Sequence, residues 1–286
     1  MIIWLASYPK SGNTWLRAYI TSLLSENITE NSLENMTSIR AYPLTDDFKN
    51  LLDDYKDFKK IAQNWETTQN IINLQKKIRF LKTHHILCNV ENFPFTNYKN
   101  SLGAIYVVRD PRNIITSLLH HYSLENYESA LEFLFDKHRF SGRLDRKENL
   151  ERQTEFPTYI SSWNTHYNAW KNFKKNYLLI KYEDLINESE KTFTSITKYI
   201  SSILDIKISS QKMTDAITKS SFKNLRHSEE KFGFSESPID AKTNEQKKFF
   251  NLGPKNNWQE LLPNEIKEKI EKKFRKEMIE LGYLTL

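Results

Sequence analysis

The sequence has little cysteine and no long apolar run. Among its 286 residues Cys88 is the single cysteine, which excludes an internal disulfide and favours a reducing compartment. No stretch approaches the roughly 18 apolar residues of a membrane-spanning helix. The opening MIIWLAS lacks the basic start and the length of a signal peptide. We therefore expect a cytoplasmic protein without a membrane span, and the sequence leaves its oligomeric state open.

Metal-ligand clusters and nucleic-acid motifs are also missing. No group of His, Cys, Asp and Glu has the spacing of a metal site, so no metal is expected. The formal net charge of +6 is a weak guide, because a diffuse lysine excess usually marks a solvated surface. Anionic ligands and nucleic acids are the sharper alternatives. Because the basic residues are spread along the chain, an anionic small ligand is favoured and nucleic acid is not expected.

Short apolar runs alternate with helical patterns, which indicates an α/β fold. The apolar runs predict strands at 2–7, 79–84, 102–109 and 176–185. The periodic segments predict helices at about 14–24, 111–121, 157–173, 189–203, 209–219 and 263–281. Because the connections are long, the sheet should be parallel and flanked by helices.

Three regions differ from this alternation. Residues 36–78 and 123–156 are charged and mostly helical in pattern, and residues 226–248 are polar and read as a mobile loop. None of the three resembles an independent domain. We therefore expect one domain over residues 1–286, with these regions as insertions or lids.

The stretch SYPKSGNTWLR (7–17) joins the first strand to the first helix. A helix start attracts an anion through its amides and the positive end of its dipole. Gly12 lets the backbone come close, and Lys10, Ser11 and Thr14 can donate hydrogen bonds. The lysine precedes the glycine, so this is not a Walker A loop. Spacing alone leaves a P-loop-like nucleotide loop and an ordinary turn equally open.

A family resemblance narrows this choice. YPKSGNTW closely resembles the 5′-phosphosulfate-binding loop, Y-P-K-S-G-T-T-W, of sulfotransferases that use 3′-phosphoadenosine 5′-phosphosulfate (PAPS). The resemblance implies that Lys10, Ser11, Gly12, Asn13 and Thr14 hold the 5′-phosphate. It also implies that Trp15 packs near the adenine, although Trp15 equally fits a plain core position. Asn13 departs from the usual threonine, and its amide can still donate to a phosphate.

Further segments resemble the same family in the same order. YVVRDPRNIITS looks like its 3′-phosphate segment, which implies that Arg109 and Ser117 bind that group. The family's other motifs are matched by KTH (82–84), YEDL (182–185), SSFKNL (220–225) and FFNLGPKNNW (249–258). They imply nucleotide contacts by Tyr182, Ser220, Phe222 and Gly253.

The sequence departs from the family at one cationic contact. The Arg-Lys pair of the last motif is replaced by Asn251-Leu252, and Lys255, Arg226 and Lys223 are candidates to replace it. The chain also begins at its first strand, without the N-terminal extension of the animal enzymes, which looks more like the bacterial members.

The resemblance implies in-line sulfuryl transfer from PAPS to a hydroxyl or amine of a small-molecule or glycan acceptor. His84 would be the base, because imidazole titrates near neutrality. Lys10 would stabilise the leaving oxygen and Lys82 the sulfuryl oxygens. Neighbours on a strand point to opposite faces, so only one of His84 and His85 can face the donor, and we choose His84.

Other readings of these residues stay open. Lys10 and Lys82 are also consistent with solvated surface charges, and Arg109 with a salt bridge to Asp110 or Asp184. A P-loop-type ATP-dependent kinase is the alternative enzyme. A non-catalytic nucleotide-binding relative is the third possibility, motivated by Asn251-Leu252. The remaining histidines and Cys88 fit structural positions.

Overall fold

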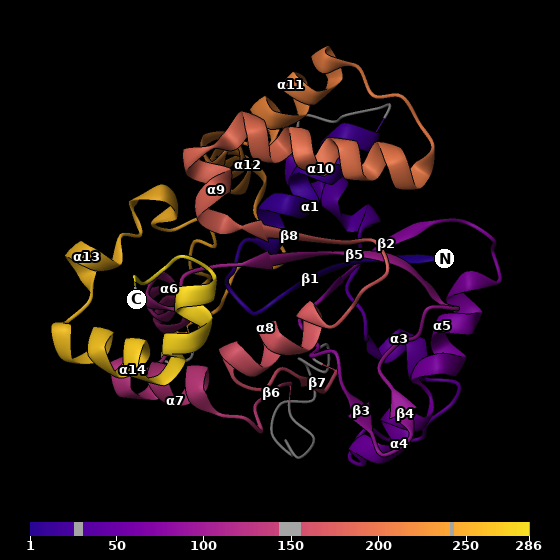
Figure 1. The fold of residues 1–286 in the computed structure, drawn as a ribbon, viewed down its shortest axis with the longest axis horizontal. Helices are drawn as coiled ribbons and strands as arrows, with labels where there is room; N and C mark the ends of the chain where they lie inside the picture. The colour runs from indigo at the N-terminus through magenta and orange to yellow at the C-terminus, as the bar shows by residue number, and fades with distance from the viewer. Residues whose placement is uncertain (26–30, 143–155, 241–242, 286) are drawn as a thin grey trace. The chain divides into compact units, whose positions relative to one another are not determined.

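The computed structural model describes residues 1–25, 31–142, 156–240 and 243–285 (Figure 1). Its main sheet has the strand order β2-β1-β5-β8. These strands are β1 (Ile2–Ser7), β2 (Arg79–Thr83), β5 (Ser101–Val108) and β8 (Tyr177–Lys181). Strands β1 and β2 run parallel, with Ile2 opposite Arg79 and Ala6 opposite Thr83. The predicted α/β fold with a parallel sheet flanked by helices is confirmed.

The last predicted strand, 176–185, is wrong in its second half. Strand β8 ends at Lys181, and helix α9 (Tyr182–Asn187) begins at the next residue. Glu183 and Asp184 occupy the first turn of α9, where carboxylates interact favourably with the helix dipole. The apolar alternation of the sequence does not reveal this switch, because the strand and the helix follow each other without a turn.

The chain packs as two compact units. Unit 1 consists of Met1–Tyr8, Ile39–Tyr106 and Asp136–Leu179, and unit 2 of Pro9–Ser38, Val107–Phe135 and Ile180–Leu286. Neither unit is one continuous stretch of sequence. The expectation of one domain with insertions at 36–78, 123–156 and 226–248 stays a prediction.

Unit 1 has an aromatic core that includes Trp4, Trp65, Phe95 and Trp170, all fully buried. Its smaller elements are α3 (Thr45–Phe48), α4 (Phe58–Gln63), α5 (Trp65–Asn73), α8 (Trp163–Lys171), and the pairs β3 (Asn89–Val90) with β4 (Phe93–Pro94) and β6 (Phe140–Ser141) with β7 (Thr158–Tyr159). The helix predicted at 157–173 therefore begins late. Ser161, with φ of 65°, separates β7 from α8.

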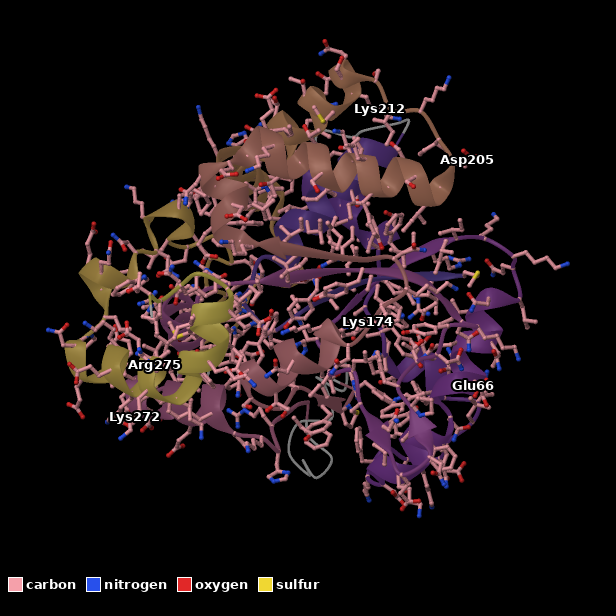
Figure 2. The ribbon with its side chains drawn as sticks, in the orientation of Figure 1. Glu66, Lys174, Asp205, Lys212, Lys272 and Arg275 are labelled. Atoms are coloured by element: carbon pink, nitrogen blue, oxygen red, sulfur yellow. The ribbon has the colours of Figure 1, made fainter. Side chains whose placement is uncertain are left out.

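Unit 2 is mainly helical. It contains α1 (Asn13–Leu24), α2 (Ser32–Asn35), η1 (Met36–Ser38), α6 (Pro111–Tyr122), α7 (Tyr127–Phe135), α9, α10 (Ser189–Leu204), α11 (Ser210–Lys219), α12 (Phe222–Phe232), η3 (Gly253–Lys255), α13 (Trp258–Leu261) and α14 (Asn264–Glu280). Helix α14 lies beside α6 and α7 (Figure 1). It buries Phe274 and Met278, whereas its charged Lys272 and Arg275 point outward (Figure 2). This amphipathic pattern is the one predicted for 263–281.

The predicted loop 226–248 is wrong in its first part, because residues 226–232 complete α12. The charged face of this helix hides its regularity in the sequence, since only Leu225 contributes an apolar residue to its buried side. Residues 143–155 and 241–242, which belong to two of the three predicted insertions, lie outside the described residues. None of the described helices combines the length and apolar content that crossing a bilayer demands.

Candidate functional site

The first turn of α1 has no side-chain cap for its backbone amides. Gly12 is the N-cap residue, with φ of 105°, and no side chain caps the helix. The first hydrogen bond within the helix runs from Leu16 N–H to the Gly12 carbonyl at 3.2 Å. The amides that precede Leu16 therefore lack helical acceptors, and the helix dipole adds positive potential at the same point. These features are consistent with the anion site predicted for the loop, and anion binding itself stays a prediction.

Ser11 and Trp15, near this turn, each bury a polar side-chain atom that has no hydrogen-bond partner among the described residues. Ser11 is fully buried, and its hydroxyl finds no acceptor or donor among the described residues. The indole N–H of Trp15 is in the same condition. An unsatisfied buried polar group costs about 1–3 kcal/mol, so such groups call for an explanation. The Ser11 hydroxyl fits an anion that would complete its hydrogen bonding.

Lys10 adds the positive charge of the loop. Its Nζ lies 3.2 Å from Nδ1 of His121 on α6 and 4.1 Å from the ring centroid of Phe249. Its backbone is left-handed, with φ of 65°. A structural position was expected for His121, so its contact with Lys10 was not predicted. Nothing in the local pattern of His121 points to a residue 111 positions away.

Arg109 follows β5 and connects three predicted site residues. Its Nη1 donates to the carbonyl of Lys10 at 3.0 Å and to the Ser117 hydroxyl at 3.3 Å. Its guanidinium lies 4.1 Å from the ring centroid of Tyr182. Arg109 is 5% exposed. The structure thus brings Arg109, Ser117 and Tyr182 to the loop of Lys10, although these residues are far apart in sequence.

Tyr182 closes the other side of the Gly12 turn. A Cβ added at Gly12 would lie 2.5 Å from Cδ2 of Tyr182, so only glycine fits beneath this ring. The ring of Trp15 meets that of Tyr182 edge-on, with centroids 5.9 Å apart. Burial raises the pKa of the Tyr182 phenol, so it stays neutral near pH 7. Trp15 also packs on the core cluster that contains Ala18 and Phe250, so both readings of Trp15 hold structurally.

The two C-terminal motifs meet each other within unit 2. A Cβ at Gly253 would overlap the ring of Phe222, and Gly253 has φ of 56°. Ser220 is fully buried, and its hydroxyl donates to the carbonyl of Ala216 at 2.8 Å. The structure therefore joins Phe222 to Gly253 but commits the Ser220 hydroxyl to its own helix. The nucleotide contacts predicted for these residues stay predictions.

The cations proposed to replace the Arg-Lys pair differ in their surroundings. Arg226 contacts Glu230 on the same helix at 3.3 Å, whereas Lys223 and Lys255 are exposed. Leu252, which stands in the position of the lysine, is 38% exposed. Positions 251 and 252 therefore carry no positive charge, and replacement of the pair by Lys255, Arg226 or Lys223 stays a prediction.

Asp110 forms its salt bridge with Arg112 and not with Arg109, the partner considered as an alternative in the sequence analysis. Asp110 pairs with Arg112 at 2.6 Å, and both side chains are 5% exposed. The Asp110 carboxylate also caps α6 by accepting from Arg112 N–H at 2.9 Å. Arg112 in turn contacts Glu271 of α14 at 2.6 Å. Asp184, the other proposed partner, lies 3.8 Å from Lys181.

His84 lies in unit 1, at the carboxyl end of β2. Its Nδ1 is 2.7 Å from the carbonyl oxygen of Ser7 and 3.3 Å from the Ser7 hydroxyl. A carbonyl only accepts, so Nδ1 carries the proton of the neutral ring and Nε2 carries the lone pair. The β1–β2 register therefore selects the tautomer that a general base requires.

A hydrogen bond from helix α8 fixes the backbone of His84. His166 Nε2 donates to the His84 carbonyl at 3.1 Å, and the hydroxyl of Tyr106 contacts His166 Nδ1 at 2.8 Å. Burial lowers the pKa of His166 to about 3, so this ring is neutral and can make both bonds. His166 thus acts as a structural histidine, in agreement with the reading from the sequence.

His85 points into the core instead. It is fully buried and stacks on Phe95 with centroids 4.2 Å apart. Burial lowers the pKa of His85 to about 3, and burial raises that of the Cys88 thiol to about 12. Lys82 and His84 are half-buried by comparison. Among the described residues no group of three His, Cys, Asp or Glu side chains could hold a metal ion.

Comparisons with known proteins agree with this geometry. The sulfotransferase domain model matches residues 2–282. Flavonol 3-sulfotransferase of Flaveria bidentis is 25% identical over 278 residues, covering 94% of this chain and 79% of the relative. Sulfotransferase 1B1 of Canis lupus familiaris is 21% identical, covering 96% and 82%. Mouse sulfotransferase SULT7A1 complexed with PAP is similar in fold, with a TM-score of 0.59 at 22% identity, covering 97% of this chain and 84% of that one.

Proposed function

From the premise that the chain belongs to the sulfotransferase domain family, we propose that it transfers a sulfuryl group from PAPS to a hydroxyl or amine of a small-molecule or glycan acceptor. The observation that supports this most directly is the turn at Gly12. Its amides lack a side-chain cap, and Lys10 and the buried Ser11 hydroxyl accompany them. These groups match the chemistry of a phosphosulfate.

The residues present fit the nucleotide on two further observations. Gly12 lies beneath the Tyr182 ring with no room for a Cβ, so the turn that would hold a phosphate requires glycine at this position. Arg109 and Ser117 lie within hydrogen-bond distance of each other and offer a guanidinium and a hydroxyl to a second phosphate. When bound, PAPS supplies the sulfuryl group and leaves as adenosine 3′,5′-bisphosphate (PAP).

The protein's own contribution to the reaction comes from three side chains. His84 would accept the acceptor's proton at Nε2, because Ser7 holds the proton of the neutral ring at Nδ1. Lys10 would neutralise charge that develops on the leaving oxygen, and Lys82 charge on the sulfuryl oxygens. Arg109 holds the Lys10 carbonyl, which fixes the backbone from which the Lys10 amine reaches out.

A non-catalytic nucleotide-binding relative is the second candidate. The observation that favours it is the Asn251-Leu252 pair, which removes two cations from the last motif and leaves Leu252 exposed. This candidate predicts nucleotide binding without turnover on any acceptor, so the experiments below separate it from the enzyme.

Calorimetry tests the ligand. We expect PAP to bind the full chain more tightly than ATP, because the 3′-phosphate has Arg109 and Ser117 as partners. ATP binding more tightly than PAP would instead favour the kinase. A screen of phenols, sugars and lipids with labelled PAPS then identifies an acceptor, and the absence of transfer to all of them alongside tight PAP binding would favour the non-catalytic relative.

His84→Ala tests the mechanism once an acceptor is known. Removing a positioned base is expected to lower kcat by about 10²–10⁴ while PAP affinity is retained. His227→Ala is the matched control, because His227 is an exposed histidine on α12. Since burial lowers the pKa of His85 and His166 to about 3, neither can account for a limb of the pH profile near neutrality. Unchanged transfer by His84→Ala would remove His84 from the mechanism.

A further inference from the structure

Asn256 is a buried side chain for which the sequence offers no role. It is 7% exposed and follows η3, in the segment that lacks the Arg-Lys pair. Its Oδ1 accepts from the Thr116 hydroxyl at 2.6 Å. Its Nδ2 donates to the Asn113 carbonyl at 2.8 Å and to the Ser117 hydroxyl at 3.1 Å. The amide thus bridges the C-terminal motif to one face of α6, with both ends engaged.

The orientation of this amide follows from its partners. The Asn113 carbonyl can only accept, so the atom of Asn256 that faces it must be the NH₂ group. The opposite flip would place two acceptors 2.8 Å apart. Nδ2 therefore donates to Ser117 as well, and this contact cannot be reversed.

Ser117 consequently accepts two hydrogen bonds at one oxygen. Arg109 Nη1 donates to it at 3.3 Å and Asn256 Nδ2 at 3.1 Å. Both lone pairs of the hydroxyl are engaged, so its hydrogen must point toward another acceptor. No described residue accepts that hydrogen. A hydroxyl in this state is a fixed donor.

We propose that Asn256 is a positioning residue for the 3′-phosphate of the nucleotide. By donating to Ser117 Oγ, it prevents this hydroxyl from accepting elsewhere and turns its hydrogen toward the phosphate that Arg109 also contacts. The inference rests on the proposed function, and it concerns the segment in which Asn251 and Leu252 stand for two cations. An uncharged, oriented donor takes over part of their role.

Substitution of Asn256 should leave the segment in place, because two neighbouring contacts also hold it. Trp258 N–H donates to Oδ1 of Asn113 at 2.9 Å. The guanidinium of Arg112 lies 3.8 Å from the Trp258 ring centroid. A thermal melt of each variant, in the full chain, checks that the fold is retained.

The test compares affinities for PAP and adenosine 5′-phosphate, which lacks the 3′-phosphate. Asn256→Ala is expected to lower the PAP preference about tenfold, the value of a hydrogen bond to a charged group. Asn256→Asp should lower it further, because a carboxylate would accept the Ser117 hydrogen and repel the phosphate. Asn257→Ala is the matched control, since the Asn257 side chain contacts only Gln259 and Glu260 of its own segment in the described structure. Its preference should equal that of the wild type.

A double-mutant cycle with Ser117→Ala tests the route. If Asn256 acts through Ser117, Asn256→Ala causes no further loss of preference in the Ser117→Ala background. Additive losses of the preference for PAP, or an equal loss of affinity for both nucleotides in Asn256→Ala, would overturn the inference. Asn256 would then have a packing role only. A wild type without preference for PAP would end the proposed function itself, and with it this inference. Tight, selective binding that survives Asn256→Ala would end the inference alone.

Discussion

Helices α1 and α6 both begin just after a strand, but their first turns are completed in opposite ways. At α6, the Asp110 carboxylate caps the helix, and Arg112 neutralises that carboxylate at 2.6 Å. At α1, the cap residue is Gly12, which has no side chain to offer, and the first turn carries no acidic residue. The start of α6 is therefore capped and neutralised by side chains of its own segment, whereas the start of α1 has neither a side-chain cap nor an acidic residue in its first turn.

This difference shows that a strand followed by a helix does not by itself make a ligand site. The N-terminus of each helix carries the positive end of its dipole, which stabilises a nearby anion by about 0.3–1 kcal/mol. We expect the cap residue to decide which of the two helix starts can bind an anion. The Asp110 carboxylate supplies a negative charge at the start of α6. Lys10 instead adds a positive charge to the loop that leads into α1. The following substitutions test this contrast, in order of decreasing effect.

The largest effect is expected from Asp110→Ala. It removes the α6 cap and one partner of the buried Arg112, which keeps its contacts with Glu271, the carbonyl of Tyr283 and the Trp258 ring. We expect the free energy of unfolding to fall by about 3 kcal/mol, measured by urea denaturation. Asp110→Asn keeps a capping oxygen, so a smaller loss is expected. A loss below about 1 kcal/mol would show that the α6 start does not depend on its carboxylate.

Gly12→Ala should have the next largest effect, and on binding more than on folding. The new Cβ would lie 2.5 Å from the buried ring of Tyr182, so the turn must shift. We expect PAP affinity to fall about 100-fold, the equivalent of about 3 kcal/mol, by calorimetry. Gly233→Ala is the control, because Gly233 has φ of 76° but nothing within 4 Å of its Cβ. An equal affinity loss in both variants would attribute the effect to backbone strain.

Ser11→Ala should have the smallest effect. It should lower the affinity for PAP without lowering the melting temperature. The Ser11 hydroxyl is buried without a partner, so its removal should leave the melting temperature unchanged or raise it. PAP affinity should nevertheless fall about tenfold, for one lost hydrogen bond to a charged group, worth about 1.5 kcal/mol. Ser101→Ala is the control: its fully buried hydroxyl accepts from Trp4 Nε1 at 2.7 Å, so that variant should be destabilised. Destabilisation by Ser11→Ala would contradict this account.

The sequence predicted the elements around this contrast because their signals are local. The apolar run 2–7 is β1, and the Asp-Pro start of α6 appears as an N-cap followed by proline at N1. The glycine of the loop is likewise a local signal, and it falls at the one position where φ is 105°. The second half of the predicted strand 176–185 is wrong because α9 begins at Tyr182, whose ring packs against Gly12, a tertiary contact that the local pattern does not contain.

Residues that act over long sequence separations could not be predicted. Glu229, also absent from the sequence interpretation, accepts from the amides of Phe249 and Phe250 at 2.6 and 2.9 Å and so fixes the aromatic ring beside Lys10. Asn256 reaches α6 across 140 positions. Asn256 lies within the motif segment 249–258, but nothing in that segment or around Glu229 indicates the long-range contact, because a side chain that bridges two segments leaves no periodic trace in either one.

The left-handed backbone of Lys10 has a consequence for protein engineering. A non-glycine residue with φ of 65° carries a conformational cost of about 1 kcal/mol, which glycine would avoid. A library randomised at this position and selected only for heat resistance should enrich glycine or asparagine. Selection for stability alone would remove the Lys10 side-chain amine. A screen for stabilised variants therefore has to measure turnover from its first round.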